Sequence, residues 1–413
     1  MRKIASVLGV ALCAGIAAAQ TTSFGTDPGM AVHAVRSGAA PLKSCPSIET
    51  YGGSAGSADN SPALVAALTT PAGDGHCVSF PPGRFTFASA VTFKLPDGHA
   101  SATLSGAGAD VTELNWPNGG GLSFEFVGQA NSVHVRDLSL TTGTAGAGRA
   151  LVLEQSAKLI GNPADTALSD VSGVSIRGAD GYAVTDYWET GVEIVGVSNV
   201  NMTGLVVTGP GGEAYASHGQ GVVLEGSADA PLVVFNIAGA TFNYLLKGLI
   251  YGNEVEGVTV SQTNFTGDAY GIFVPDRLHG LDQLAVTGSQ FNCALAGVYV
   301  GSYTSNTLFN SNLFIVPNTG TGVLLKQAYL YSAVGNAFNS GSASMTASHP
   351  VGIEIGPTAG GGTITGNLFD NMAAAVILEK GSTGGNVQSN EYSNDPVTVK
   401  NLGSGNQIGG GSP

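Results

Sequence analysis

The chain carries little charge. Of its 413 residues, 11% are Asp, Glu, Lys or Arg, and 29 acidic residues against 15 basic ones give a formal net charge of −14. Nucleic acids and anionic membranes present dense negative charge, which an acidic protein of this kind repels. The composition therefore argues against nucleic acid and anionic lipid as partners.

Cysteine is scarce, with four in the chain, and no Cys/His spacing typical of a zinc site occurs. No metal site is predicted from these residues. Cys45 and Cys77 bracket the N-terminal region and are candidates for a disulfide in an oxidising compartment. Cys293, which comes shortly after an aromatic residue, is expected to be a buried thiol.

Long apolar segments are absent after residue 19, so no membrane span is predicted. Residues 1–19 combine Arg2 and Lys3 with an apolar stretch that ends in three Ala residues, which indicates a secretory signal cleaved near Gln20. The protein is therefore expected to be secreted or periplasmic, with residues 20–44 as an N-terminal extension.

Helical stripes are lacking, but glycine is abundant, with 62 residues, and a short phrase recurs. Each copy is Gly followed mainly by Val, Ile and Leu, and successive copies start 23 to 30 residues apart. The copies start at Gly191, Gly221, Gly248, Gly271, Gly297, Gly322, Gly352 and, without the Gly, Ala375. A period of this length indicates a solenoid.

An aromatic residue follows each phrase at a similar period. These residues are Phe242, Phe265, Phe291, Phe314, Phe338, Phe369 and Tyr392. Because the repeats are rich in β-branched and aromatic residues, each is expected to form a coil of two or three short strands, and the coils to stack at about 4.8 Å. Asn312, Asn336, Asn367 and Asn390 each precede an aromatic residue by two positions, and they are expected to form corners with side chains hydrogen-bonded along the stack.

Within the first phrase, the first and third residues after Gly are apolar and are predicted to face the core, as Val192 and Ile194 do. The second residue varies and is predicted to face outward. The outward set includes Glu193, Phe273, Tyr299 and Glu354.

Three segments open the domain: Asp59-Asn-Ser-Pro-Ala-Leu64, Val78-Ser-Phe-Pro-Pro-Gly-Arg-Phe85 and Leu104-Ser-Gly-Ala-Gly-Ala-Asp-Val-Thr112. In this order they resemble the opening of the pectate-lyase superfamily, which contains polygalacturonase-like enzymes and phage tailspikes. The resemblance spans about residues 45–115 and, through the repeats, extends to about residue 395. It implies an all-β fold, a single-stranded right-handed parallel β-helix over residues 45–400, with a short helix capping its N-terminal end. Residues 401–413, rich in Gly and Ser, are expected to form a flexible tail.

Solenoid enzymes place their chemistry on one outer wall, in a groove framed by long loops. Glu193 and Glu225 stand at outward positions on adjacent coils, with backbones about 8 Å apart by coil and strand spacing. That separation suits the two carboxyl groups of an inverting glycosidase. The alternative is that both carboxylates only solubilise the wall.

Four further residues are candidates for acid–base chemistry. His218 lies in a Ser-His-Gly segment that resembles the Gly-His-Gly of polygalacturonases, but the Asn-Thr-Asp, Asp-Asp and Arg-Ile-Lys motifs of those enzymes are missing, so ordinary polygalacturonase activity is not expected. Lys247 and Arg277 could neutralise a uronate and abstract a proton, as Arg or Lys does in lyases of this superfamily. The alternative for Asp276 and Arg277 is an ion pair that braces a loop.

Four aromatic residues are candidates for stacking on sugar rings: Tyr187, Trp188, Phe273 and Tyr299. The alternative for Phe273 and Tyr299, which share one offset on consecutive coils, is a ladder that stabilises the sheet. No cofactor is expected. Calcium is the one metal that the resemblance to pectate lyases leaves open, although the sequence shows no compact acidic cluster.

The expected function is that of an exported polysaccharide-active enzyme, either a lyase or a glycoside hydrolase. The alternative is a non-catalytic protein that binds carbohydrate or forms a spike-like surface structure. A polysaccharide is the expected partner in each case, and the chain is expected to be a monomer or a homotrimer.

Overall fold

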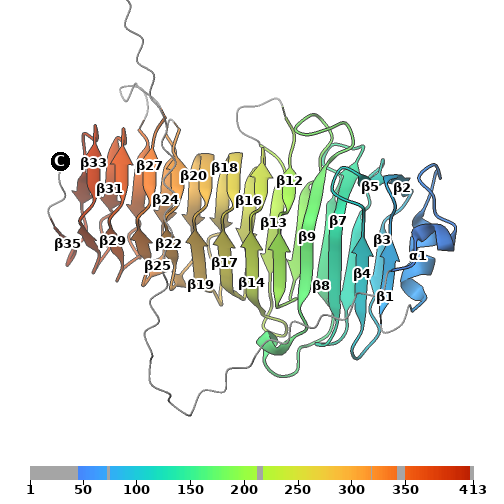
Figure 1. Ribbon diagram of the computed structural model, residues 1–413. Helices are drawn as coiled ribbons and strands as arrows, with labels where there is room; N and C mark the ends of the chain where they lie inside the picture. Colours follow the sequence, from blue (N-terminus) through green and yellow to red (C-terminus); the bar gives the residue numbers. More distant parts are fainter. Residues whose placement is uncertain (1–44, 72–74, 212–216, 318, 342–348, 410–413) are drawn as a thin grey trace, which may run out of the picture. The chain divides into compact units, whose positions relative to one another are not determined.

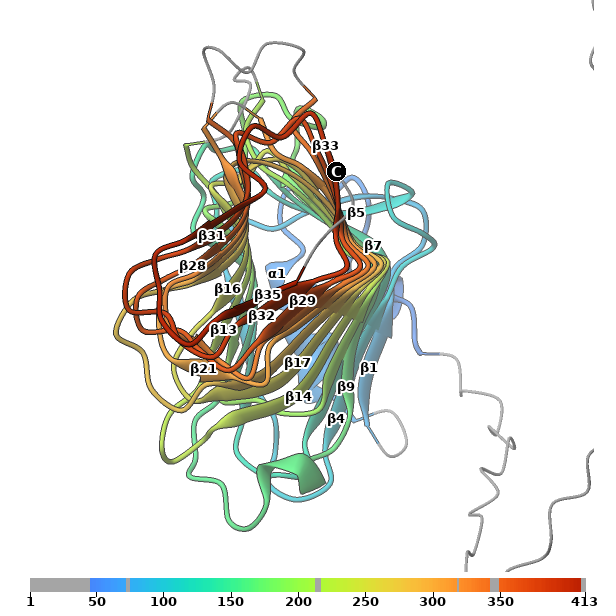
Figure 2. The ribbon, with the colours of Figure 1, turned by 90° about the vertical axis from the view of Figure 1, so that its left-hand side faces the viewer.

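The computed structural model describes residues 45–71, 75–211, 217–317, 319–341 and 349–409. The predicted signal sequence and the extension to residue 44 lie outside the described residues. The described chain is a right-handed parallel β-helix, as predicted: three parallel sheets run along the stack (Figure 1) and enclose one apolar core (Figure 2).

The first sheet contains the recurring Gly phrase. Its strands are β3 (Val91–Lys94), β6 (Leu122–Phe126), β8 (Arg149–Gln155), β10 (Thr190–Val195), β13 (Gln220–Glu225), β16 (Lys247–Tyr251), the ends of β18 (Asn264–Val274) and β20 (Gln290–Val300), β24 (Thr321–Leu325), β28 (Val351–Ile355), β31 (Ala374–Leu378) and β34 (Val399–Asn401).

The second sheet follows the first within each coil. Its strands are β1 (His76–Ser79), β4 (Ser101–Ser105), the starts of β7 (Ser132–Thr142) and β9 (Ser169–Gly178), β11 (Val200–Thr203), β14 (Leu232–Ala238), β17 (Val255–Ser261), β19 (Asp282–Thr287), β22 (Leu308–Asn310), β26 (Ser332–Val334), β29 (Thr363–Thr365), β32 (Asn386–Gln388) and β35 (Gln407–Ile408), with β21 (Thr304–Ser305) and β25 (Ala328–Tyr329) at its margin.

The third sheet carries the aromatic phrase. It comprises β2 (Gly83–Thr86), β5 (Thr112–Trp116), the ends of β7 and β9, β12 (Val206–Thr208), β15 (Thr241–Asn243), the starts of β18 and β20, β23 (Leu313–Ile315), β27 (Ala337–Asn339), β30 (Leu368–Asp370) and β33 (Glu391–Ser393). The long strands β7, β9, β18 and β20 each belong to two sheets and join them at a corner.

The N-terminal end is covered by the helix α1 (Ser61–Thr69), which contacts β1 and β3 (Figure 1). Its first turn is capped by Asp59, whose Oδ1 accepts the backbone N–H of Ser61 at 2.8 Å. Leu64 and Leu68 of the helix are buried. The predicted cap is therefore present. Two 3₁₀ turns, Ile48–Tyr51 and Pro163–Asp165, complete the helical elements of the described residues.

The two sequence phrases are linked by packing in the core. The seven predicted aromatic rings stack in one column, with centroids 4.7 to 5.7 Å apart. Each phrase Gly from Gly221 to Gly352 lies against the ring of its own coil: a Cβ added at Gly322 would lie 2.6 Å from Phe338. Glycine thus allows the backbone to approach the ring closely, which explains why the two phrases keep the same period.

The predicted asparagine ladder is confirmed. Asn312, Asn336, Asn367 and Asn390 are buried, and the side-chain N–H of each of the first three donates to the Oδ1 of the next at 2.9 to 3.0 Å. The prediction of a flexible tail from residue 401 is wrong as far as residue 409, because β35 continues the second sheet and pairs with β32. Residues 410–413 lie outside the described residues.

Candidate functional site

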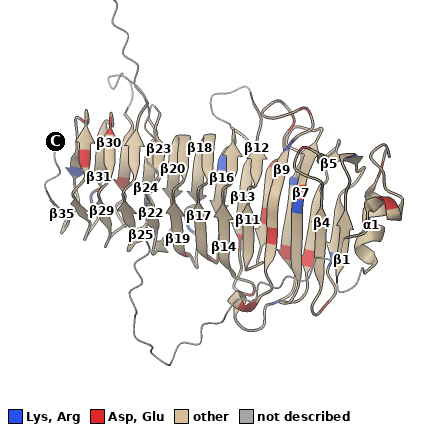
Figure 3. Ribbon diagram, viewed as in Figure 1, with Lys and Arg blue, Asp and Glu red and all other residues tan. Residues whose placement is uncertain are grey.

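The outer face of the first sheet carries half of the predicted catalytic and stacking residues, namely Glu193, Glu225, Lys247, Phe273 and Tyr299. Charged residues are sparse on the strands (Figure 3), so the few on this face stand out. The predicted outward column is confirmed by the strand register, in which Ile250, Phe273, Tyr299, Leu324 and Glu354 are neighbours in turn.

Phe273 and Tyr299 form a stacked pair, with centroids 4.9 Å apart and planes 11° from parallel. The ammonium of Lys247 lies 4.1 Å from the centroid of Phe273, and that of Lys326 lies 5.0 Å from the centroid of Tyr299. Both faces of each ring are therefore covered by a neighbour on the stack. The prediction that these faces stack on sugar rings is wrong, and the ladder alternative, extended by two cation–π contacts, describes them.

Asp276 joins this ladder from the following turn. Its carboxylate accepts the hydroxyl of Tyr299 at 2.9 Å and lies 3.8 Å from the ammonium of Lys326. Lys326 is therefore its ion-pair partner. Arg277 is exposed, has a left-handed backbone with φ of 69°, and has no side-chain partner among the described residues. The predicted Asp276–Arg277 brace is thus absent from the described chain.

Beside this ladder is a hollow of about 440 Å³, which we call the Glu354 hollow. It is lined by Leu324, Lys326, Gln327, Glu354, Gly356, Pro357, Thr358 and Glu379. Glu354 and Glu379 are half-buried, and neither carboxylate has a hydrogen bond or ion pair within the described residues.

The two carboxyl groups of the Glu354 hollow differ in their environments. Burial raises the pKa of Glu354, and the negative charge of Glu379 raises it further, against the opposing effect of Lys326 and Lys400. Glu354 pairs in register with Ile377, so Glu379 stands one coil and two residues further on. A coil step of about 4.8 Å and two residues of about 6.6 Å place their backbones about 8 Å apart.

The predicted pair Glu193 and Glu225 has the same register offset but does not converge. Glu193 forms an ion pair with Arg149 of the preceding coil. Glu225 accepts a hydrogen bond from Asn253, in the turn after β16 of the following coil, at 2.9 Å. The two carboxylates therefore engage partners on opposite sides. Sequence reasoning missed the Glu354–Glu379 pair, although Glu354 occupies an outward position that is aromatic or aliphatic on the four preceding coils.

The predicted stacking residue Trp188 belongs to the core. It is only 2% exposed, packs edge-on against Trp116, and donates its indole N–H to the carbonyl of Leu140 at 3.2 Å. That assignment is wrong, because the ring cannot meet a ligand. Tyr187 and His218 lie near each other at the wall, with ring centroids 6.1 Å apart, and their roles stay predictions.

Cys45 and Cys77 lie side by side on the first coil. Ser47 forms a parallel bridge with Ser79, which aligns the residues two positions earlier. Both cysteines are free thiols in the structure, and burial, together with a hydrogen bond that the Cys45 thiol donates to Cys77, raises the pKa of Cys45 to about 12. The disulfide stays a prediction. Cys293 is buried, as expected.

The family model described as "Periplasmic copper-binding protein (NosD)" matches residues 160–408, more than half of the chain. The chain belongs to the NosD family. No curated protein sequence matches this NosD-family protein. No helix among the described residues is long and apolar enough to cross a bilayer.

Solved structures with this fold include enzymes and phage proteins. DFA-IIIase from Arthrobacter chlorophenolicus A6 in complex with GF2 is 13% identical, with a TM-score of 0.53 over 83% of this chain and 93% of that one. Tailspike protein 3 of bacteriophage CBA120 is 13% identical, with a TM-score of 0.53 over 89% and 62%. The Dettilon tailspike is 11% identical, with a TM-score of 0.51 over 81% and 65%. At these identities the likeness confirms the parallel β-helix fold alone.

The family description names copper, so the donors among the described residues decide whether this chain could hold it. Copper(II) favours imidazole-rich sites, whereas copper(I) favours sulfur. The described residues contain no group of three or more His, Cys, Asp or Glu side chains that could hold a metal ion. His134 Nδ1 is occupied by Asp170, and the ring of His76 is buried against Phe93. The described residues therefore do not fit a copper centre, and calcium likewise has no described cluster of carboxylates to bind it.

Proposed function

We propose that this NosD-family protein is an exported glycoside hydrolase that cleaves a polysaccharide in the Glu354 hollow. The observation that carries the proposal is the pair of unpartnered carboxyl groups in that hollow, one of which has a raised pKa. Export is supported by the signal-like residues 1–19 and by the periplasmic description of the family.

Glu354 acts as the general acid in this proposal. Its raised pKa keeps the carboxyl group protonated at a higher pH than that of an ordinary Glu, so it can protonate the leaving oxygen of the glycosidic bond. Glu379 acts as the general base and takes a proton from the attacking water. Backbones about 8 Å apart allow the two carboxyl groups to reach the separation of about 6.5–9.5 Å that leaves room for that water in inverting enzymes.

Lys326 positions the substrate, because its ammonium lines the same hollow and can donate to sugar hydroxyls. The charge of the hollow also sets the class of substrate. Three carboxylates, those of Glu354, Glu379 and the adjacent Asp276, outnumber the two nearby lysines, Lys326 and Lys400, so a polyuronate would bring its own carboxylates against an excess of negative charge. We therefore propose a polysaccharide without uronate groups, which favours hydrolysis over lyase chemistry.

The test is the release of reducing ends from polysaccharides without uronates. Glu354→Gln and Glu379→Gln should each lower kcat about 10²- to 10⁴-fold, the usual contribution of a general acid or base, with a smaller change in KM. Glu391→Gln, which removes an exposed charge from β33 on the third sheet, should leave activity unchanged. Ionisation of Glu354 should define the alkaline limb of the pH profile, so that activity falls as pH rises.

Three outcomes would reject this assignment. Full activity in both variants would remove the two carboxyl groups from the mechanism. Absorbance from unsaturated uronate ends, on incubation with a uronate polymer, would show a lyase instead. Binding of a polysaccharide without release of reducing ends from any polysaccharide tested would favour the non-catalytic role.

A further inference from the structure

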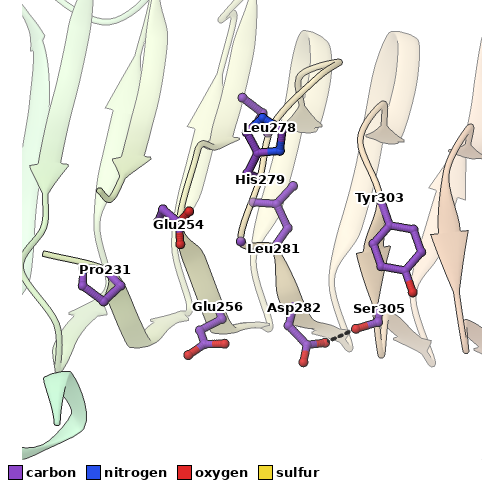
Figure 4. Close-up of a pocket in the computed structure, with 10 residues that line it drawn as sticks. Pro231, Glu254, Glu256, Leu278, His279, Leu281, Asp282, Tyr303 and Ser305 are labelled. Carbon is purple, nitrogen blue, oxygen red and sulfur yellow. Dashed lines mark hydrogen bonds between the residues drawn. The ribbon is translucent and has the colours of Figure 1, made fainter. Parts of the chain in front are cut away.

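A second and larger hollow, of about 600 Å³, lies where the first sheet turns into the second (Figure 4). We call it the Tyr303 hollow. It is lined by Pro231, Glu254, Glu256, Leu278, His279, Gly280, Leu281, Asp282, Tyr303 and Ser305. None of the residues predicted from the sequence to be catalytic lines it.

The Tyr303 hollow is elongated along the stack. Glu256 pairs with Asp282, and Asp282 pairs with Ser305, so these three side chains form a row on successive coils (Figure 4). With Pro231 on the coil before them, the lining spans three coil steps, or about 14 Å. An extended polymer fits such a shape better than a compact ligand does.

Its lining combines apolar contact with hydrogen-bond acceptors. Tyr303 is 56% exposed at one end of the hollow, and the half-buried Pro231 at the other end and Leu278 between them add apolar surface. The carboxylates of Glu254 and Glu256 have no partner among the described residues. An exposed aromatic ring, apolar surface and free acceptors match a sugar unit, which presents C–H faces and hydroxyl donors.

The charge of the lining is of one sign. Burial raises the pKa of Asp282, but hydrogen bonds from Ser305 and Asn306 outweigh this effect and leave the pKa below its ordinary value. This carboxyl group is therefore ionised at neutral pH. No Lys or Arg is among the described residues that line the hollow. Its field therefore favours a cation and disfavours an anionic sugar.

The two hollows are adjacent along the stack. Thr304 pairs with Ala328, which makes the preceding residues, Tyr303 and Gln327, neighbours on consecutive coils. Tyr303 lines the larger hollow and Gln327 lines the Glu354 hollow. One extended chain can therefore occupy both.

We propose that the Tyr303 hollow is a subsite for sugar units that carry free, protonated amino groups, on the same polymer that the Glu354 hollow cleaves. The identity of the polymer rests on the proposed function. The preference for the amine does not, because it is measured by binding alone. The shape and the apolar lining bind the sugar chain, and the unpartnered carboxylates of Glu254 and Glu256 select the amine.

The test uses full-length Glu354→Gln protein, in which binding is measured without cleavage. An oligomer of β-linked glucosamine and its N-acetylated counterpart of equal length are titrated by calorimetry at low salt. We expect the free-amine oligomer to bind at least tenfold more tightly, and the difference to shrink as salt is added. Adding Glu254→Gln and Glu256→Gln should remove the difference, whereas Tyr303→Ala should weaken both oligomers.

A charge-matched control carries Glu154→Gln and Glu391→Gln, two exposed glutamates outside the lining. It should retain the preference for the amine. Equal binding of the two oligomers, or a preference that survives in the Glu254/Glu256 variant, would overturn the proposal. Because no cleavage is needed, loss of this preference and loss of hydrolysis are separate results.

Discussion

At the scale of single residues, the least typical group is a buried carboxyl. Asp268 is fully buried, where a bulge in the pairing of β18 with β20 turns the strand from the third sheet into the first. Its Oδ1 accepts the N–H of Leu245 at 2.8 Å, whereas its Oδ2 has no partner. Burial raises the pKa of Asp268 well above its ordinary value, so folding favours the neutral acid.

This environment predicts a pH-dependent stability. The folded state holds a proton on Asp268 that the unfolded chain loses near pH 4, so stability should fall as pH rises above that value, by up to about 1.4 kcal/mol per pH unit. Asp268→Asn keeps the acceptor for Leu245 without a charge. We expect the variant to match the parent near pH 4 and to be more stable at pH 8, by thermal unfolding.

The control is Asp97→Asn, at an exposed turn where Oδ1 accepts the N–H of Gly98. It should not change the slope of stability against pH. If Asp268→Asn lost stability equally at pH 4 and pH 8, the buried group would be a charged structural partner, and the assignment of a neutral acid would fail.

The residue scale is also where the sequence was least informative. Alternation within a strand correctly separated inward Val192 from outward Phe273, because a strand has a fixed period. Trp188 precedes its strand in a loop, where no period tells inside from outside. The repeat spacing predicts that Phe273 lies beside Tyr299. It does not predict that lysines cover the outer faces of the pair, because the position of each ammonium depends on the direction of its side chain.

At the scale of elements, the turn between the second and third sheets depends on the asparagine ladder. Asn336 accepts from the backbone and side-chain N–H groups of Asn312 at 3.0 Å, and donates to the carbonyl of Phe309 and to Asn367. The sequence could predict this ladder, since equal spacing from an aromatic residue places each Asn directly above the last.

Asn336→Ala should therefore destabilise the protein. It leaves the buried N–H of Asn312 and the carbonyl of Phe309 without these partners, at a cost of about 1–3 kcal/mol for each group. Chemical denaturation should show a lower midpoint. Asn386→Ala is the matched control, because this Asn lies in the second sheet with no side-chain hydrogen bond among the described residues. Equal midpoints for the two variants would contradict a structural role for the ladder.

At the scale of the whole described β-helix, stability should decrease toward its C-terminal end. Each coil of a solenoid is stabilised mainly by its neighbours, so its ends open most easily unless they are covered. The helix α1 covers β1 and β3 at the N-terminal end. At the other end, β34 and β35 are largely exposed, and among the residues described up to 409 no helix packs on them.

Hydrogen exchange would test this gradient. We expect amides in β33 to β35 to exchange first, those in β13 to β24 to be protected longest, and those in β1 to β3 to fall between the two. Replacing Leu64 and Leu68 of α1 by Ala removes buried packing worth about 2–5 kcal/mol per residue, and should accelerate exchange in β1 to β3 while leaving β33 to β35 unchanged. Nearest-neighbour stacking predicts that opening starts at the exposed end. Simultaneous exchange of all coils would contradict this prediction and would mean that the described chain unfolds as one unit.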